Sequence, residues 1–79
     1  MKVTIAKVDE TLFDGEAESL TVPAVSGEMT ILGEHMPLIT TLKGGTVTVR
    51  GKNIPDEKQF FEIKGGVLEV RQDGVTIVL

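Results

Sequence analysis

The sequence predicts an all-β fold, a flattened β-sandwich or barrel of about 8–10 short, mostly antiparallel strands. Apolar and polar residues alternate with a period of two in short runs. Val, Ile and Thr fill these runs, and β-branched residues suit a pleated surface. Turn-forming residues separate the runs at regular intervals. No window carries an apolar stripe at a 3.6-residue period, so we expect little or no helix.

Each expected strand follows from this alternation. The first has Val3 and Ile5 between polar neighbours, and the last has Val75 and Ile77. Gln72-Asp73-Gly74 between two alternating runs is typical of a hairpin. Gly44-Gly45 and Gly65-Gly66 indicate places where the backbone bends between strands. The expected strands are residues 3–8, 11–14, 16–22, 28–32, 38–42, 46–50, 58–63, 67–71 and 75–79.

Length and charge narrow the possible functions. The 79 residues predict a single domain over 1–79, with a net charge of −4. An acidic chain with three Phe and no Trp or Tyr is a poor binder of nucleic acid, which needs cations and stacking platforms. Without cysteine there is no disulfide, and with one histidine a zinc site is not expected. So small a domain needs additional stabilisation, and we expect a partner protein to supply it.

The sequence contains no recognisable catalytic set. His35 is the only imidazole, and neither Ser19 nor Ser26 has the flanking pattern of a nucleophile elbow. Asp9-Glu10 is explained by a solvated turn, as is the pair at 56–57. The paired glycines are followed by strands instead of the lysine and helix start of a phosphate-binding loop. We therefore predict no catalytic residue, no metal ligand and no cofactor.

Four blocks, in order, carry a resemblance to a known family. Residues 27–38 read GEMTILGEHMPL, which is similar to the pattern Gly-Glu-x-x-x-x-Pro-Gly-His-x-Pro-Leu of the epsilon subunit of rotary ATP synthases. The blocks FDGEAESLTVP (13–23), LKGGTVTV (42–49) and GGVLEVRQDGVTIVL (65–79) resemble that family's early strand pair, its Leu-Lys-x-Gly turn and its last hairpin. One departure is Gly33-Glu34, which replaces the family's Pro-Gly before the histidine.

The resemblance implies a non-catalytic central-stalk subunit that docks on the gamma subunit and on the ring of c subunits. By position, Glu28 resembles the acidic residue near the ring loops, where an arginine would pair with it. His35 and Thr40 resemble positions near gamma and the ring-facing end, and Lys7 a first-strand position near gamma. The implied location is peripheral, on the cytoplasmic side of the bacterial plasma membrane, with membrane association only through the complex.

The resemblance also concerns the end of the chain. The family usually continues into a C-terminal helical hairpin, whereas the sequence stops at Leu79. If this is the whole protein, the resemblance implies a minimal subunit without the helical brake on ATP hydrolysis; the alternative, that the sequence is a piece of a longer chain from which the hairpin has been removed, stays open.

Other interpretations stay open at this stage. His35 either caps a turn or is an interface contact, and in the second case docking should weaken across roughly pH 5–7. A biotinyl or lipoyl carrier domain is also a small β-module, with Lys43, Lys52 and Lys64 as its modifiable candidates. A small hydrolase centred on His35 is a third possibility.

Overall fold

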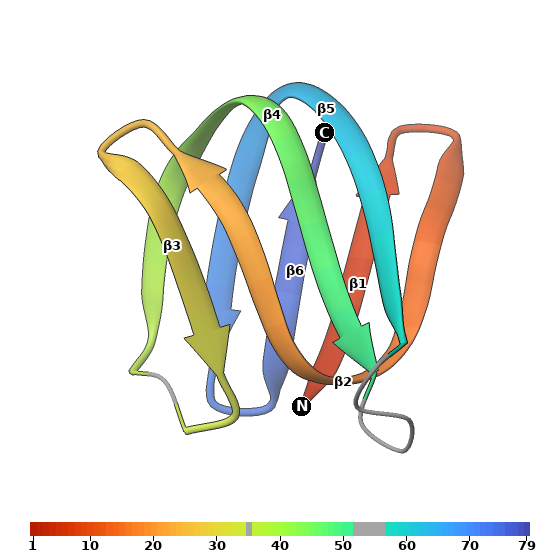
Figure 1. Cartoon of the computed structure of the whole chain (residues 1–79), viewed down its shortest axis with the longest axis vertical. Coiled ribbons are helices and arrows are strands. Elements are labelled where there is room, and N and C mark those ends of the chain that lie inside the picture. The colour runs from red at the N-terminus through yellow and green to blue at the C-terminus, as the bar shows by residue number, and fades with distance from the viewer. Residues whose placement is uncertain (35, 52–56) are drawn as a thin grey trace.

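The alternating segments form six β-strands in a computed structural model that describes residues 1–34, 36–51 and 57–79. No helix occurs in the described ranges, so they contain no helix that could cross a membrane. The strands, shown in Figure 1, are β1 (Lys2–Lys7), β2 (Glu10–Ala24), β3 (Gly27–Leu32), β4 (Leu38–Gly51), β5 (Lys58–Arg71) and β6 (Gly74–Val78).

The long strands β4 and β5 bend together at their paired glycines. Lys43 lies opposite Gly65 and Gly45 lies opposite Ile63, so the pairing register is the same on both sides of the bend. The β4–β5 ribbon therefore folds over as one unit, as the two arches in Figure 1 show. Each of these strands contributes one half to each of two layers.

Strand β2 also serves both layers. Its first half pairs with β1, and its second half pairs with β3 on one side and β4 on the other. One layer has five strand segments in the order β2 (10–16), β1, β6, β5 (65–71) and β4 (38–43). The other has four, in the order β3, β2 (17–24), β4 (45–51) and β5 (58–63). The β1–β6 pair is parallel and the other pairs are antiparallel.

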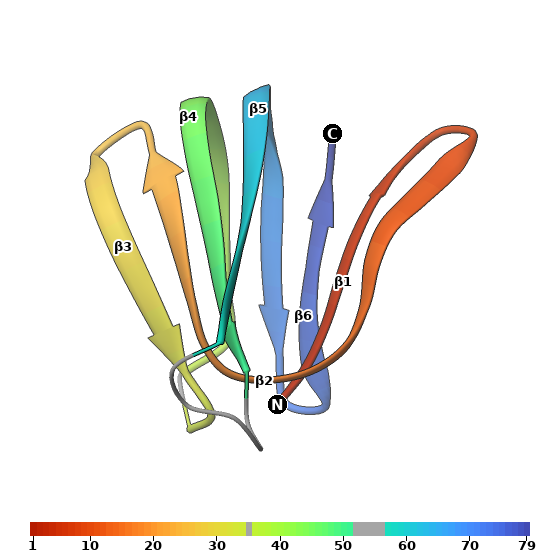
Figure 2. The same cartoon turned by 45° about the vertical axis from the view of Figure 1, so that its right-hand side comes forward.

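The core lies between these two layers (Figure 2). Ile5, Leu68 and Ile77 point inward from the five-stranded layer, and Leu20 and Ile31 from the four-stranded layer. All five are fully buried, and no polar residue is buried among the described residues. Close packing of this kind makes a stiff module.

The expected fold class is confirmed. Every predicted strand coincides with a strand or half-strand, apart from the single end residues Val8 and Leu79. The difference is continuity, because three pairs of predicted strands merge into β2, β4 and β5. The glycines that the sequence analysis placed between strands lie inside them, so the nine predicted segments belong to six strands.

The two ends of the sandwich differ in what they carry. One end, here called the bend end, holds the β1–β2 turn, the β2–β3 turn and the bends of β4 and β5 (Figure 1). The chain also finishes there, with the Leu79 amide donating to the Ala6 carbonyl at 2.9 Å. The opposite end holds Met1 and the β5–β6 turn (Figure 1).

Candidate docking surface

The outer face of the four-stranded layer carries a row of threonines. Thr30, Thr21 and Thr48 lie side by side on β3, β2 and β4, and Phe60 follows on β5. The hydroxyls of Thr21 and Thr30 share a hydrogen bond of 3.0 Å. Among the apolar side chains on this face, Phe60 and Leu32 are strongly exposed, and they stand at opposite edges of the layer. Their separation means that they do not form a continuous apolar surface.

The outer face of the five-stranded layer is different, because its exposed aliphatic residues adjoin. Val67 on β5 lies directly opposite Val78 on β6, and Val78 lies beside Ala6 on β1. Ile39 on β4 is diagonal to Val67, two residues from Thr41, which is paired with Val67. Ile39 is 71% exposed, Val78 53% and Val67 44%. We call Ile39, Val67, Val78 and Ala6 the apolar patch.

Two of the predicted contact positions flank the apolar patch. Lys7 follows Ala6 directly, and its ammonium lies 3.5 Å from the Glu10 carboxylate. Thr40 follows Ile39, but it is paired with the buried Leu68 and is itself half-buried. Because side chains alternate along a strand, Thr40 faces the inner side of β4 while Ile39 faces outward. The exposed surface at this point of β4 is therefore formed by the side chain of Ile39.

Glu28 lies apart from the apolar patch, on the other layer. It is the second residue of β3, where that strand leaves the bend end, and it is exposed and paired with Pro23. Lys7 ends β1 at the same end of the sandwich (Figure 1). The structure thus places Glu28 and Lys7 at one end without bringing them into contact.

The remaining predicted positions are less informative. His35 lies outside the described residues, and its role stays a prediction. Of the lysines considered for a carrier domain, Lys43 and Lys64 lie within the bends of paired strands instead of at a hairpin tip. Lys52 lies outside the described residues.

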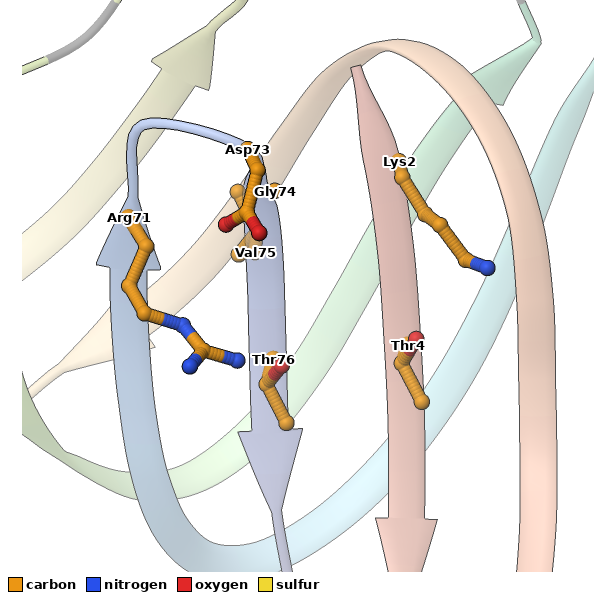
Figure 3. A pocket seen from close by; sticks show the side chains of 7 residues that line it. All are labelled: Lys2, Thr4, Arg71, Asp73, Gly74, Val75 and Thr76. Carbon is orange, nitrogen blue, oxygen red and sulfur yellow. The ribbon is translucent and has the colours of Figure 1, made fainter.

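A shallow polar groove lies beside the apolar patch on the same face (Figure 3). It has a volume of about 170 Å³ and runs over β6, between Arg71 of β5 and Lys2 of β1. Thr4 and Thr76, which are partners across β1 and β6, lie on its floor. Neither this groove nor any other part of the described chain gathers three side chains of the metal-ligating type.

The sequence matches the family described as the ATP synthase delta/epsilon chain β-sandwich domain, over residues 1–79. The chain belongs to this family. Relatives include the ATP synthase epsilon chain of Herminiimonas arsenicoxydans, which is 40% identical over 99% of this chain and 55% of its own length. The epsilon chain 2 of Burkholderia orbicola is 38% identical over 99% of this chain and 51% of its own. The chain thus spans about half the length of the curated relatives that it matches.

Two solved structures contain chains with this fold. A chain of the Euglena gracilis mitochondrial ATP synthase, from a structure of OSCP, F1 and the c-ring, has a TM-score of 0.86 at 26% identity, over 96% of this chain and 48% of its own. A chain of the Tetrahymena thermophila central stalk and c-ring has a TM-score of 0.78 over 98% of this chain and 60% of its own, and at 18% identity it supports the fold alone.

The members of the apolar patch were not predicted as site residues from the sequence. A signal for them was present, because Ile39, Val67 and Val78 occupy positions that alternate with inward-facing residues. Outward apolar residues mark a surface that a partner can cover when they adjoin one another. Recognising the patch as one surface required the β4–β5–β6–β1 register, which the alternation alone does not contain.

Proposed function

We propose that this chain is a rotor subunit of an F-type ATP synthase, which docks on the gamma subunit through the apolar patch and on the c-ring through the bend end. The family supports the assembly, since its members are delta or epsilon chains of ATP synthases. The similar Euglena chain comes from a structure that contains the c-ring. In this role the chain couples ion translocation to ATP synthesis and performs no chemistry itself.

The apolar patch is the observation that favours the five-stranded layer as the face that binds gamma. Interfaces have apolar centres from which charges are depleted, with a polar rim. Val67 and Val78 are adjacent and exposed, and Lys7 and Glu10 stand at the margin. Burying the exposed parts of Ile39, Val67 and Val78 contributes on the order of 1 kcal/mol each. We therefore place gamma on the five-stranded layer.

The bend end suits the second contact. Glu28 is exposed there, and a ring loop that carries arginine would pair with its carboxylate. An exposed pair of this kind contributes under about 1 kcal/mol, so Glu28 sets the register of docking more than its strength. Thr40 supports the neighbouring surface from within β4, and His35 remains a proposed contact. Membrane association follows from the complex, on the cytoplasmic side of a bacterial plasma membrane.

A rotor subunit must also transmit torque without deforming. β4 and β5 pass through both layers, so the layers are joined by continuous backbone as well as by packing. The unchanged register across the bend keeps the ladder hydrogen bonds in phase on both sides. A load applied to the apolar patch on β5 is therefore carried directly into the four-stranded layer.

Calorimetry with the gamma subunit from the same source tests this proposal. We expect one-to-one binding with a negative heat-capacity change, the signature of apolar burial. Absence of binding, with both proteins folded, would contradict it. The intact mass would then be measured, because a biotinyl or lipoyl adduct would support the carrier domain instead.

A further inference from the structure

The polar groove lies next to the apolar patch on the outer face of the five-stranded layer. Thr76 precedes Val78 by two residues on β6, and both side chains point outward. Val67, Glu69 and Arg71 are alternate residues of β5. Because side chains alternate along a strand, all three lie on the outer face. A protein seated on Val67 and Val78 therefore has the groove within reach.

The lining of the groove has one more positive than negative charge, and each of its two cations is paired with a carboxylate outside the lining. The whole chain carries a net charge of −4, whereas the groove is lined by Lys2, Arg71 and a single carboxylate, Asp73. Glu69 and Asp14 stand outside the lining, each beside one of the cations. An anionic group is the complement of such a lining.

The two cations retain donors for such a group. Lys2 Nζ lies 3.6 Å from Asp14 Oδ1, and Arg71 Nε lies 3.7 Å from Glu69 Oε1. Both distances exceed the range of a good hydrogen bond. A guanidinium has five N–H donors and the pair with Glu69 is made through Nε, so both NH₂ groups can serve another acceptor. Figure 3 shows this guanidinium directed over β6 toward Thr76.

The groove has no side chain at Gly74, where two strands come together. A methyl group at Gly74 would lie 3.1 Å from the carbonyl oxygen of Lys2, so β6 and β1 approach closely there. The volume of about 170 Å³ equals that of about six water molecules and accommodates an extended side chain. The Thr76 hydroxyl is half-buried on this floor and can donate to an oxygen above it.

We infer that the groove receives an acidic side chain of the protein that covers the apolar patch. The carboxylate accepts hydrogen bonds from the Arg71 guanidinium and the Thr76 hydroxyl, and Lys2 adds positive charge from β1. This inference rests on the proposed function, because it takes the gamma subunit as the partner. In this arrangement the groove determines which partner binds and in what orientation, and the apolar patch supplies most of the binding free energy.

Paired charge reversals in the full chain test the inference by calorimetry with the gamma subunit. Arg71→Glu removes the proposed donor, and Lys58→Glu makes the same charge change on the outer face of the four-stranded layer. We expect Arg71→Glu to weaken binding at least about tenfold and Lys58→Glu to change it less than about twofold. Thermal melts of both variants verify that they fold.

Two milder variants separate a hydrogen-bonded site from a general charge effect. Arg71→Lys keeps the charge and loses the planar fork, and Thr76→Val keeps the shape and loses the hydroxyl. Each should weaken binding several-fold.

The outcomes distinguish a failure of the groove inference from a failure of the proposed function. Unchanged affinity in Arg71→Lys and Thr76→Val, or equal losses in Arg71→Glu and Lys58→Glu, would overturn the groove while leaving the proposed function standing. Absence of binding by the unchanged chain would overturn both.

Discussion

A methyl group on Gly45 would lie 3.0 Å from Cβ of Pro23, so the bend of β4 packs directly against β2. Gly45 also has a φ of +156°, which side chains rarely adopt. The same contact fixes the start of β3, because Pro23 is paired with Glu28. The bend, the β2–β3 turn and the proposed ring contact therefore depend on one glycine.

Gly45→Ala should destabilise the domain by about 1–3 kcal/mol, because the methyl group forces Pro23 to shift and strains the backbone. Gly44→Ala is the control. A methyl group there would lie 3.6 Å from the carbonyl oxygens of Ile63 and Lys64, an ordinary contact. Its stability should change by less than about 1 kcal/mol. Urea unfolding of both variants measures the difference, and equal losses would contradict the packing described.

The aromatic pair at the margin of the core should show a measurable coupling. Phe13 of β2 and Phe61 of β5 meet edge to face, with ring centroids 6.1 Å apart and an interplanar angle of 67°. A double-mutant cycle with Phe13→Leu and Phe61→Leu should give a coupling free energy of about 0.5–1.5 kcal/mol. Repeating the cycle with Phe60→Leu, whose side chain is on the outer face, should give a value near zero. Coupling of equal size in both cycles would refute this assignment.

Glu28→Lys should weaken attachment to the c-ring several-fold and leave the isolated fold intact. The exposed carboxylate loses its pair with a ring arginine, and the new ammonium repels it. Glu18→Lys makes the same charge change at an exposed position on a different strand, β2, and should leave attachment to the c-ring unaltered. Retention of the chain on detergent-solubilised complexes is the measurement, with thermal melts for the fold. Unchanged retention of Glu28→Lys would remove Glu28 from the ring contact.

The fold class could be predicted from the sequence because inward and outward residues differ in polarity. The alternation that places Val3 and Ile5 inside the core is local, and so are the signals of the β5–β6 turn at Asp73. Strand continuity could not be predicted in this way. A pair of glycines is compatible with a turn or with a bend inside a strand, and the Lys43–Gly65 register that decides for a bend links residues distant in sequence.

The candidate site was less predictable for the same reason. Lys7 and Thr40 were identified through a family resemblance, which supplies positions but not the direction of side chains. The pairing of Thr40 with Leu68 turns it inward and leaves Ile39 on the surface. The contact between Val67 and Val78 depends on the β5–β6 register.

The central claim is that the apolar patch, and not the outer face of the four-stranded layer, meets the gamma subunit. Val67→Glu and Phe60→Glu place the same charge on outward positions of the same strand, β5, in opposite layers. The decisive measurement is the affinity of both variants for gamma by calorimetry. The account predicts that Val67→Glu loses at least about tenfold in affinity, because a charge would be buried at the centre of the interface, while Phe60→Glu binds like the unchanged chain. Retained binding by Val67→Glu together with loss in Phe60→Glu would contradict it.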